Sequence, residues 1–364
     1  MFELTNDQRK CFALPPVLES WRKVEVKPGP YDKERTYAYL DGKRIMKVIR
    51  ICEDFGRALY YEYGVDQLLS EDETKLIPKT DKGKPQNFIA PNLVKRTPLG
   101  MALSFDCGCV SVSNQDSDQC FYRSVYDGVR VNCFSEFVAW VNTWCLSTGD
   151  SELQEINAFA AKGKRYQKFK EGDFFRYRIN RSLYGYGRIL LDFGKMRKQN
   201  VKFWDIFMGK PLCVSVYHIA TEDANLTPEQ LLGRKCLPSQ MIMDNIFYYG
   251  ECEVIGNVPI TPDEEDFPIH YGRSISLQNP DCIHYQCGRE FVSLDGAKQL
   301  FGGFRNGGIG WSLNVRLSIL EECIKQGSNL PYWEMIPPYE ANKDLRNPKF
   351  HAELKLIREQ MGIE

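Results

Sequence analysis

Apolar and polar residues alternate along much of the first half of the chain, and this pattern predicts β-strands. Two alternating stretches at 36–51 flank Asp41 and Gly42, a residue pair that strongly favours a hairpin turn. Further strands are expected at 58–63, 101–105 and 110–112. Residues 70–98 are rich in charge, proline and lysine, so we expect a long exposed loop there.

A helical period replaces this alternation after residue 133. Ser135 is a good N-cap residue. Apolar residues spaced by three or four positions share one face of the expected helix: Phe134, Phe137, Val138, Val141, Trp144 and Cys145. The segment 147–171 then begins with turn residues, continues as a short amphipathic helix and ends in a polar run. We therefore expect a first domain at 1–150 and a helical, basic connector at 151–170.

The second half returns to alternation and ends in helices. Strands are expected at 173–179, 187–193, 212–219 and 242–255, with a hairpin near 180–184. Thr227 and Gln230 form a capping-box pair with proline at the first helical position. Ser312 is expected to cap a later helix that ends at Gly327, and a tail helix is expected at 348–361. The pattern predicts an α+β protein of two domains, each a mainly antiparallel twisted sheet with a few packed helices. The second domain is placed at 171–345, followed by a C-terminal helix at 346–364.

Composition supports a folded protein and narrows the possible partners. The 364 residues suit about two domains, and 47 basic against 48 acidic residues leave a net charge of −1. This balance argues against a nucleic-acid coat and against a polybasic membrane binder. No apolar run is long enough to span a membrane, and the first ten residues carry charge where a signal peptide is apolar. We expect a cytoplasmic protein. Its 13 cysteines are odd in number and scattered, so we expect reduced thiols.

Cysteine and histidine offer two candidate sites, and each has a simpler interpretation. Three residues of the types that bind zinc lie close together in sequence: Cys282, His284 and Cys287. A structural zinc site usually takes four ligands from two short motifs, and no second motif of matching spacing is present. In a strand, Cys287 would also point away from the other two residues. Cys107 and Cys109 could supply a nucleophile, but no motif places a base beside them. We expect a buried strand at 282–287, no metal, no cofactor and no catalytic residue.

Three further segments combine unusual composition with possible binding. The glycine-rich run 301–311 could cradle a phosphate, although a tight chain reversal beneath Trp311 explains it better. The acidic run Asp263, Glu264, Glu265 and Asp266 is either a solvated loop or a patch that attracts a basic partner. Five cations in the connector could bind nucleic acid only weakly: Lys162, Lys164, Arg165, Lys168 and Lys170.

A specific resemblance begins at residue 171. The run EGDFFRYRINRSLYGYGRILLDF, at 171–193, resembles the opening of the immunity protein 26 family of bacterial polymorphic toxin systems. The similarity extends more loosely to HYGRSISL at 270–277 and to GWSLNVRL at 310–317. From the residues themselves, Gly185 and Gly187 would let the strand bend or bulge, so that Tyr184, Tyr186 and Arg188 project.

The resemblance implies an intracellular immunity protein that binds and blocks a cognate toxin encoded nearby, without catalysis. Tyrosine, tryptophan and arginine dominate interface hot spots, so we expect Tyr184, Tyr186, Arg188 and Trp311 to contact the toxin. The acidic run would steer its approach. Two alternatives remain open: a hydrolase with a cysteine or acidic active site between the domains, and a weak nucleic-acid-binding module. The first 150 residues carry no resemblance that assigns a role.

Overall fold

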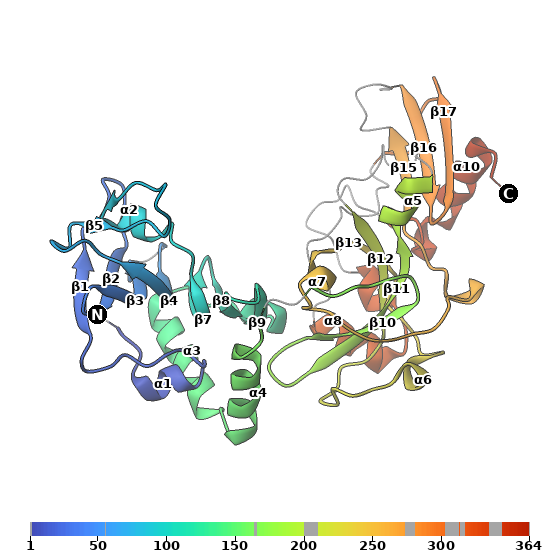
Figure 1. Ribbon diagram of the computed structural model, residues 1–364. Helices are drawn as coiled ribbons and strands as arrows, with labels where there is room; N and C mark the ends of the chain where they lie inside the picture. The colour runs from blue at the N-terminus through green and yellow to red at the C-terminus, as the bar shows by residue number, and fades with distance from the viewer. Residues whose placement is uncertain are drawn as a thin grey trace. The chain divides into compact units, whose positions relative to one another are not determined.

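The computed structural model of the chain describes residues 2–54, 56–163, 166–199, 210–273, 281–302, 313, 317–334 and 344–363. It divides into two compact units, Met1–Arg165 and Tyr166–Glu364 (Figure 1). Both units combine antiparallel sheets with packed helices, so the expected α+β class is confirmed. Among the described residues, no helix is both long and apolar enough to cross a membrane.

The first unit is built on a seven-stranded antiparallel sheet with strand order β1-β2-β3-β4-β7-β8-β9. The strands are β1 (Arg22–Val26), β2 (Arg35–Asp41), β3 (Arg44–Cys52), β4 (Leu59–Leu68), β7 (Leu99–Asp106), β8 (Cys109–Asn114) and β9 (Gln119–Arg123). Gly42 turns β2 into β3 with a positive φ of 56°, a conformation that favours glycine. The hairpin expected from the sequence is therefore present.

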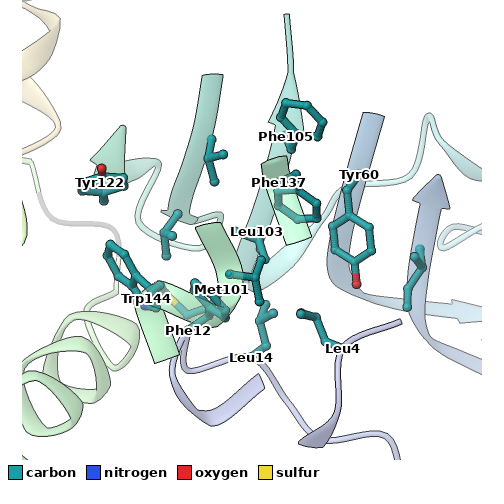
Figure 2. Close-up of a cluster of buried hydrophobic side chains, with 14 of the residues drawn as sticks. Leu4, Phe12, Leu14, Tyr60, Met101, Leu103, Phe105, Tyr122, Phe137 and Trp144 are labelled. Atoms are coloured by element: carbon teal, nitrogen blue, oxygen red, sulfur yellow. The ribbon is translucent and has the colours of Figure 1, made fainter. Parts of the chain in front are cut away.

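Helices cover one face of this sheet, and a small hairpin covers the other. The helices on this face are α1 (Asn6–Lys10), α3 (Phe134–Leu146) and α4 (Asp150–Ala160), whereas α2 (Ala90–Leu93) lies with the hairpin on the other face. Figure 2 shows Phe137 and Trp144 of α3 packed into the main core, where the Phe137 ring stacks on Phe105 at 5.0 Å. The N-cap of α3 is Cys133, two residues earlier than expected. Ile156 and Phe159 of α4 are buried in the same core, so this part of the expected connector packs against the first unit.

The second face of the sheet is covered by the segment between β4 and β7. It contains the two-stranded hairpin β5 (Lys75–Leu76) and β6 (Gln86–Asn87), followed by α2. Leu76, Ala90 and Leu93 are buried against Ala38 and Val48 of the sheet. The loop that the sequence predicted is therefore anchored by apolar contacts on its inner side.

The second unit contains a five-stranded and a three-stranded antiparallel sheet. The larger has the order β13-β12-β11-β10-β14, and the smaller has the order β15-β16-β17. The strands are β10 (Asp173–Arg178), β11 (Tyr184–Asp192), β12 (Pro211–Val216), β13 (Gln240–Met243), β14 (Glu253–Asn257), β15 (Ile269–Arg273), β16 (Cys282–Cys287) and β17 (Glu290–Asp295). The prediction of a continuous strand at 242–255 is wrong, because the short helix at Asn245–Tyr248 lies between β13 and β14.

The helices of this unit pack on both sheets. They are α5 (Phe193–Gln199), α6 (Pro228–Leu231), α7 (Asn245–Tyr248), α8 (Leu317–Gln326), α9 (Leu330–Glu334) and α10 (His351–Met361). Thr227 N donates to Gln230 Oε1 over 2.8 Å at the start of α6. Leu354, Ile357 and Met361 of α10 pack against β15 and β16, as the sequence predicts. The Ser312 cap and most of the glycine-rich run lie outside the described residues.

Candidate functional site

One face of the five-stranded sheet carries arginines opposite aromatic rings. Antiparallel pairing of β10 with β11 places Phe174 opposite Arg188, Arg176 opposite Tyr186, and Arg178 opposite Tyr184. Alternate residues of a strand point to the same face, so all six side chains lie on one side of the sheet. We call this set the arginine–aromatic ladder.

The opposite face explains the two glycines of β11. A Cβ atom on Gly185 would lie 2.2 Å from the Tyr177 ring, and one on Gly187 would lie 2.3 Å from the Phe175 ring. The glycines therefore admit aromatic rings that lie close against the strand. The expected bulge at these positions is wrong, because the register between β10 and β11 is regular from Phe174 to Arg178.

The inner end of the ladder is buried. Arg188 is only 1% exposed: its Nη2 donates to Val258 O at 2.7 Å and to Pro259 O at 2.9 Å, and its Nη1 donates to Glu264. Its guanidinium also lies 4.5 Å from the centre of the Phe174 ring. The expectation that Arg188 projects is wrong, because the loop that follows β14 folds over it and accepts hydrogen bonds from both of its Nη atoms.

Tyr186 is buried beside it. Its side chain is 0% exposed, and its hydroxyl donates to Asp223 O over 2.6 Å. Burial raises the pKa of the Tyr186 hydroxyl, which therefore stays protonated and able to donate. The expectation that Tyr186 projects is also wrong, because Tyr217 and Ile219, which follow β12, and Leu231 of α6 pack against it.

The hairpin end of the ladder is more accessible. Tyr184 and Arg178 are half-buried, and Arg178 Nη2 donates to the Tyr184 hydroxyl over 2.9 Å. Two guanidinium groups lie near the Tyr184 ring: that of Arg178 is 4.8 Å from the ring centre, and that of Arg176 is 5.3 Å from it. Arg178 Nη1 also donates to Arg181 O at 2.9 Å. These contacts hold a tyrosine and an arginine in fixed positions at the surface.

The four carboxylates of the acidic run differ in whether they contact other residues of the second unit. Glu264 accepts from Arg188, and Asp266 accepts from Ser239 N at 2.8 Å and from Arg346 Nη1 at 3.0 Å. Asp263 and Glu265 are exposed. Two of the four carboxylates therefore hold the second unit together, and the other two face solvent.

The remaining candidate residues from the sequence are the tryptophan, the connector cations and the possible metal ligands. Trp311, Lys164 and Arg165 lie outside the described residues, and Lys162, Lys168 and Lys170 are exposed. Cys282 and His284 share one face of β16 and Cys287 lies on the other, as expected from strand alternation. Within the described ranges, no three histidine, cysteine or acidic residues group as metal ligands.

Two of the candidate cysteines, Cys107 and Cys282, have thiols with a raised pKa. All 13 cysteines are free thiols. Cys107 is exposed in the turn between β7 and β8, where a hydrogen bond and the charge of Asp106 raise the pKa of its thiol. Burial likewise raises the pKa of Cys282. A raised pKa reduces the thiolate fraction at neutral pH, the opposite of what a nucleophilic cysteine requires.

Two features were missed by the sequence analysis. The first is a surface group of tyrosines in the second unit, in which the rings of Tyr166 and Tyr248 lie 4.5 Å apart and those of Tyr248 and Tyr249 lie 5.2 Å apart. Tyr166 is 56% exposed and Tyr248 is 43% exposed. The high aromatic content indicated such surfaces, but Tyr166 lies 82 residues before Tyr248, so no local signal links the group.

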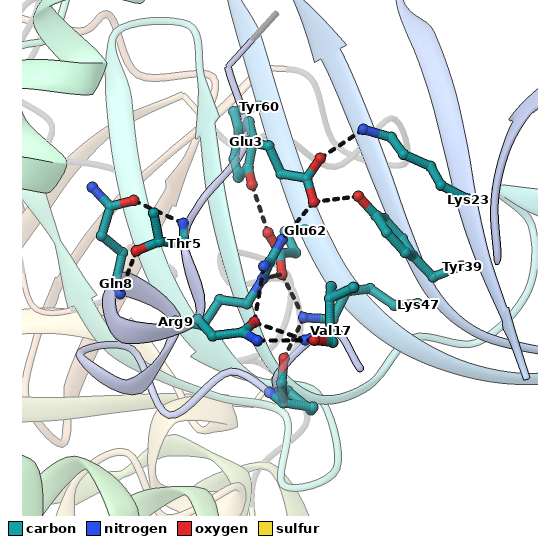
Figure 3. A network of polar contacts seen from close by, with 12 residues as sticks. Glu3, Thr5, Gln8, Arg9, Val17, Lys23, Tyr39, Lys47, Tyr60 and Glu62 are labelled. Atoms are coloured by element: carbon teal, nitrogen blue, oxygen red, sulfur yellow. Dashed lines mark hydrogen bonds and ion pairs between the residues drawn. The ribbon is translucent and has the colours of Figure 1, made fainter. Parts of the chain in front are cut away.

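The second is a buried ionic network in the first unit (Figure 3). Glu62, which is 0% exposed, accepts from Arg9 Nε at 2.7 Å and also from Lys47 and Tyr60. Lys47 Nζ also donates to Pro15 O. Burial lowers the pKa of Lys47, although the charge of Glu62 opposes this shift.

We call this network the Glu62 clamp, because it joins the N-terminal segment of the first unit to the sheet. Arg9 lies on α1, whereas Glu62 and Lys47 lie on β4 and β3, so the ion pairs fasten the N-terminal segment to the sheet. Both carboxylate oxygens of Glu62 already accept hydrogen bonds from protein groups. The arrangement stabilises the unit and leaves no carboxylate oxygen open to a substrate.

Comparison with known proteins agrees with the resemblance found in the sequence. Residues 170–282 match the model of the family described as immunity protein 26. This region contains the arginine–aromatic ladder and the acidic run, and it ends at the first residue of β16; the segment 310–317 lies beyond it. The expected similarity of the second half of the chain to this family is confirmed. No curated protein and no solved structure matches the chain.

Proposed function

We propose that this chain is an immunity protein of a bacterial polymorphic toxin system, which acts in the cytoplasm by binding a cognate toxin and covering its toxin domain. The observation that carries the proposal is the family match over residues 170–282. On this account the second unit supplies the neutralising surface, and the protein acts through binding and not through catalysis.

The contact site that we propose is the hairpin end of the ladder, in place of its buried inner end. Tyrosine and arginine are the residue types most enriched at interface hot spots. Tyr184 and Arg178 are already held by a 2.9 Å hydrogen bond and by ring stacking. Because little side-chain freedom is left to lose on binding, the entropy cost of association is reduced.

The exposed members of the acidic run support a second, electrostatic part of the proposal. Asp263 and Glu265 are exposed, whereas Glu264 is occupied by Arg188 and Asp266 by Arg346. Exposed charges at an interface rim mainly accelerate encounter with a partner of opposite charge. We propose that Asp263 and Glu265 steer a basic toxin domain toward the second unit.

The test is a binding titration of the full chain with the cognate toxin domain, which the proposal expects to be encoded nearby. Tyr184→Ala and Arg178→Ala should each weaken binding by at least about tenfold, as truncation of a hot-spot residue does. Tyr31→Ala is the control, because Tyr31 is 92% exposed and lies in the first unit. Wild-type binding by both ladder variants would remove the proposed site. Absence of any complex with the folded wild-type chain would remove the proposed function.

A further inference from the structure

Cations concentrate on the segment that covers the second face of the first unit's sheet. Between residues 75 and 96 the sequence has six basic residues and one carboxylate, Asp81. The basic residues are Lys75, Lys79, Lys82, Lys84, Lys95 and Arg96. Two more lie in the connection between β1 and β2, namely Lys27 and Lys33. We call these eight residues the basic face.

Backbone contacts bring these two stretches of chain together. Ala90 N donates to Lys27 O over 2.9 Å, and a Cβ on Gly29 would lie 2.5 Å from the Pro91 ring. Arg96 Nη2 donates to Gln86 Oε1 over 3.2 Å, which places Arg96 against β6. The connection between β1 and β2, the β5–β6 hairpin and α2 therefore form one local structure.

The segment is apolar on its inner side and cationic on its outer side. Leu76, Ala90 and Leu93 are buried in the core below the sheet. All seven lysines of the basic face are exposed, and Arg96 is half-buried. Because the apolar contacts fix the backbone, the lysines are presented on an ordered surface.

Several neighbouring carboxylates are already engaged: Asp32 accepts from Gly29 N at 2.7 Å, and Glu34 pairs with Arg50. Glu71 pairs with Lys43, and Glu73 pairs with Arg22 at 2.6 Å. Asp72 accepts from the hydroxyls of Ser70, at 2.6 Å, and Thr74, at 2.8 Å. Among the described residues, none of the eight cations of the basic face takes part in an ion pair.

We propose that the basic face binds the phosphate backbone of single-stranded nucleic acid. Exposed lysines without carboxylate partners neutralise phosphates and release the counterions condensed on the strand. Tyr31, which is 92% exposed, lies in the connection between β1 and β2 and offers a ring for base stacking. The activity is separate from toxin binding, since it uses the first unit.

The composition of the face favours nucleic acid over an acidic protein or a membrane. Lysine is depleted at protein–protein interfaces, where arginine and aromatic residues provide most of the binding energy. A membrane-surface helix needs large exposed apolar side chains beside its cations. On this segment Leu76 and Leu93 are buried, and Ile77 and Phe88 are half-buried.

The test is a titration of the full chain into a labelled 20-nucleotide poly(U) RNA, followed by fluorescence anisotropy between 50 and 300 mM salt. With three or four lysines on phosphates, the logarithm of the association constant should fall against log salt with a slope of about −2 to −3. Lys79→Glu/Lys82→Glu/Lys84→Glu should weaken binding at 50 mM salt by at least about tenfold.

A charge-matched control distinguishes an effect of the basic face from an effect of the net charge of the chain. Lys298, Lys325 and Lys355 are exposed lysines of the second unit, and their triple substitution by glutamate changes the net charge equally. The proposal expects this control to retain wild-type affinity. It is overturned if the control loses as much affinity as the basic-face variant, or if the chain does not bind poly(U) at 50 mM salt. Binding to vesicles of anionic lipid without binding to poly(U) also overturns it.

Discussion

Arg346 donates from Nη1 to Asp266 Oδ2 over 3.0 Å, and this contact ties the C-terminal segment to the acidic run. The same guanidinium donates to Ser239 O at 2.8 Å and to Asp344 Oδ2 at 2.8 Å. Asp266 lies inside the region matched by the family model, whereas Arg346 lies 64 residues beyond its end at 282. Residues outside the matched region therefore supply hydrogen bonds and an ion pair to residues inside it.

Replacement of Arg346 should loosen the acidic run. Arg346→Met leaves Asp266, Asp344 and the Ser239 carbonyl without their charged donor, at a cost of about 2 kcal/mol. Hydrogen exchange followed by mass spectrometry should show about 30-fold less protection of β13 and of residues 262–266, with the first unit unchanged. Arg289→Met is the control, since Arg289 is exposed and forms a surface ion pair with Glu171. Equal protection in both variants would contradict a holding role for Arg346.

The Glu62 clamp should control the stability of the first unit. Glu62→Gln leaves the buried Arg9 and Lys47 without their shared carboxylate, and such a loss costs about 3 kcal/mol. Exchange protection of residues 2–17 and of the sheet should fall, whereas the exposed Glu25→Gln should change nothing. A Glu62→Gln chain with wild-type protection would show that the clamp is not a stabilising feature.

Acid should weaken the same region through Glu3. Burial raises the pKa of Glu3, but hydrogen bonds from Lys23, Tyr39 and Arg9 outweigh it and hold that pKa below the ordinary 4.5. A carboxyl whose pKa is lower when folded adds stability above pH 4.5 and loses it as pH falls further. Stability of the first unit should therefore fall below pH 4.5, and Glu3→Gln should flatten that dependence. An unchanged pH profile in this variant would assign the acid sensitivity to other groups.

The exposed acids should change the association rate and not the lifetime of the complex. Asp263→Asn/Glu265→Gln should slow association with a basic toxin domain several-fold at low salt, with little effect at high salt. Stopped-flow kinetics gives both rate constants. The matched control, Glu290→Gln/Asp295→Asn, removes two exposed carboxylates from β17. An on-rate that neither salt nor the first substitution alters would remove the steering role.

Alkylation chemistry gives a separate check on the raised pKa of Cys107. The Asp106 side chain raises the pKa of Cys107, so Asp106→Asn should lower that pKa and raise the thiolate fraction at pH 7. Alkylation of the Cys107 peptide should become faster, as mass spectrometry can measure. The buried Cys213 and Cys252 should stay unmodified in both proteins. Slower or equal alkylation after the substitution would show that Asp106 does not suppress thiolate formation.

Local patterns in the sequence predict much of the secondary structure. The turn at Gly42 and the apolar face of α10 follow from rules that act within one hairpin or one helix. The prediction of a continuous strand at 242–255 was wrong because α7 interrupts it. No glycine or proline at the start of α7 signals this helix in the sequence. Short helices depend on tertiary packing more than on local propensity.

Contacts across the sheet could not be predicted in the same way. Period-2 alternation places Tyr184, Tyr186 and Arg188 on one face of β11, but it does not reveal which loops cover that face. Arg188 is buried because Val258, Pro259 and Glu264, some 70 residues later, supply its acceptors. Glu62 likewise meets Arg9 across 53 residues. Partners at such separations leave no periodic signal in a single sequence.

Growth rescue tests the central claim most directly. The account expects a cognate toxin encoded nearby. Its toxin domain would be expressed alone, together with the wild-type chain, and together with the Tyr184→Ala/Arg178→Ala variant. The account predicts arrested growth with the toxin domain alone, restored growth and a stable complex with the wild type, and weaker rescue with the variant. Persistent arrest in cells that contain folded wild-type protein, with no complex recovered, would contradict it.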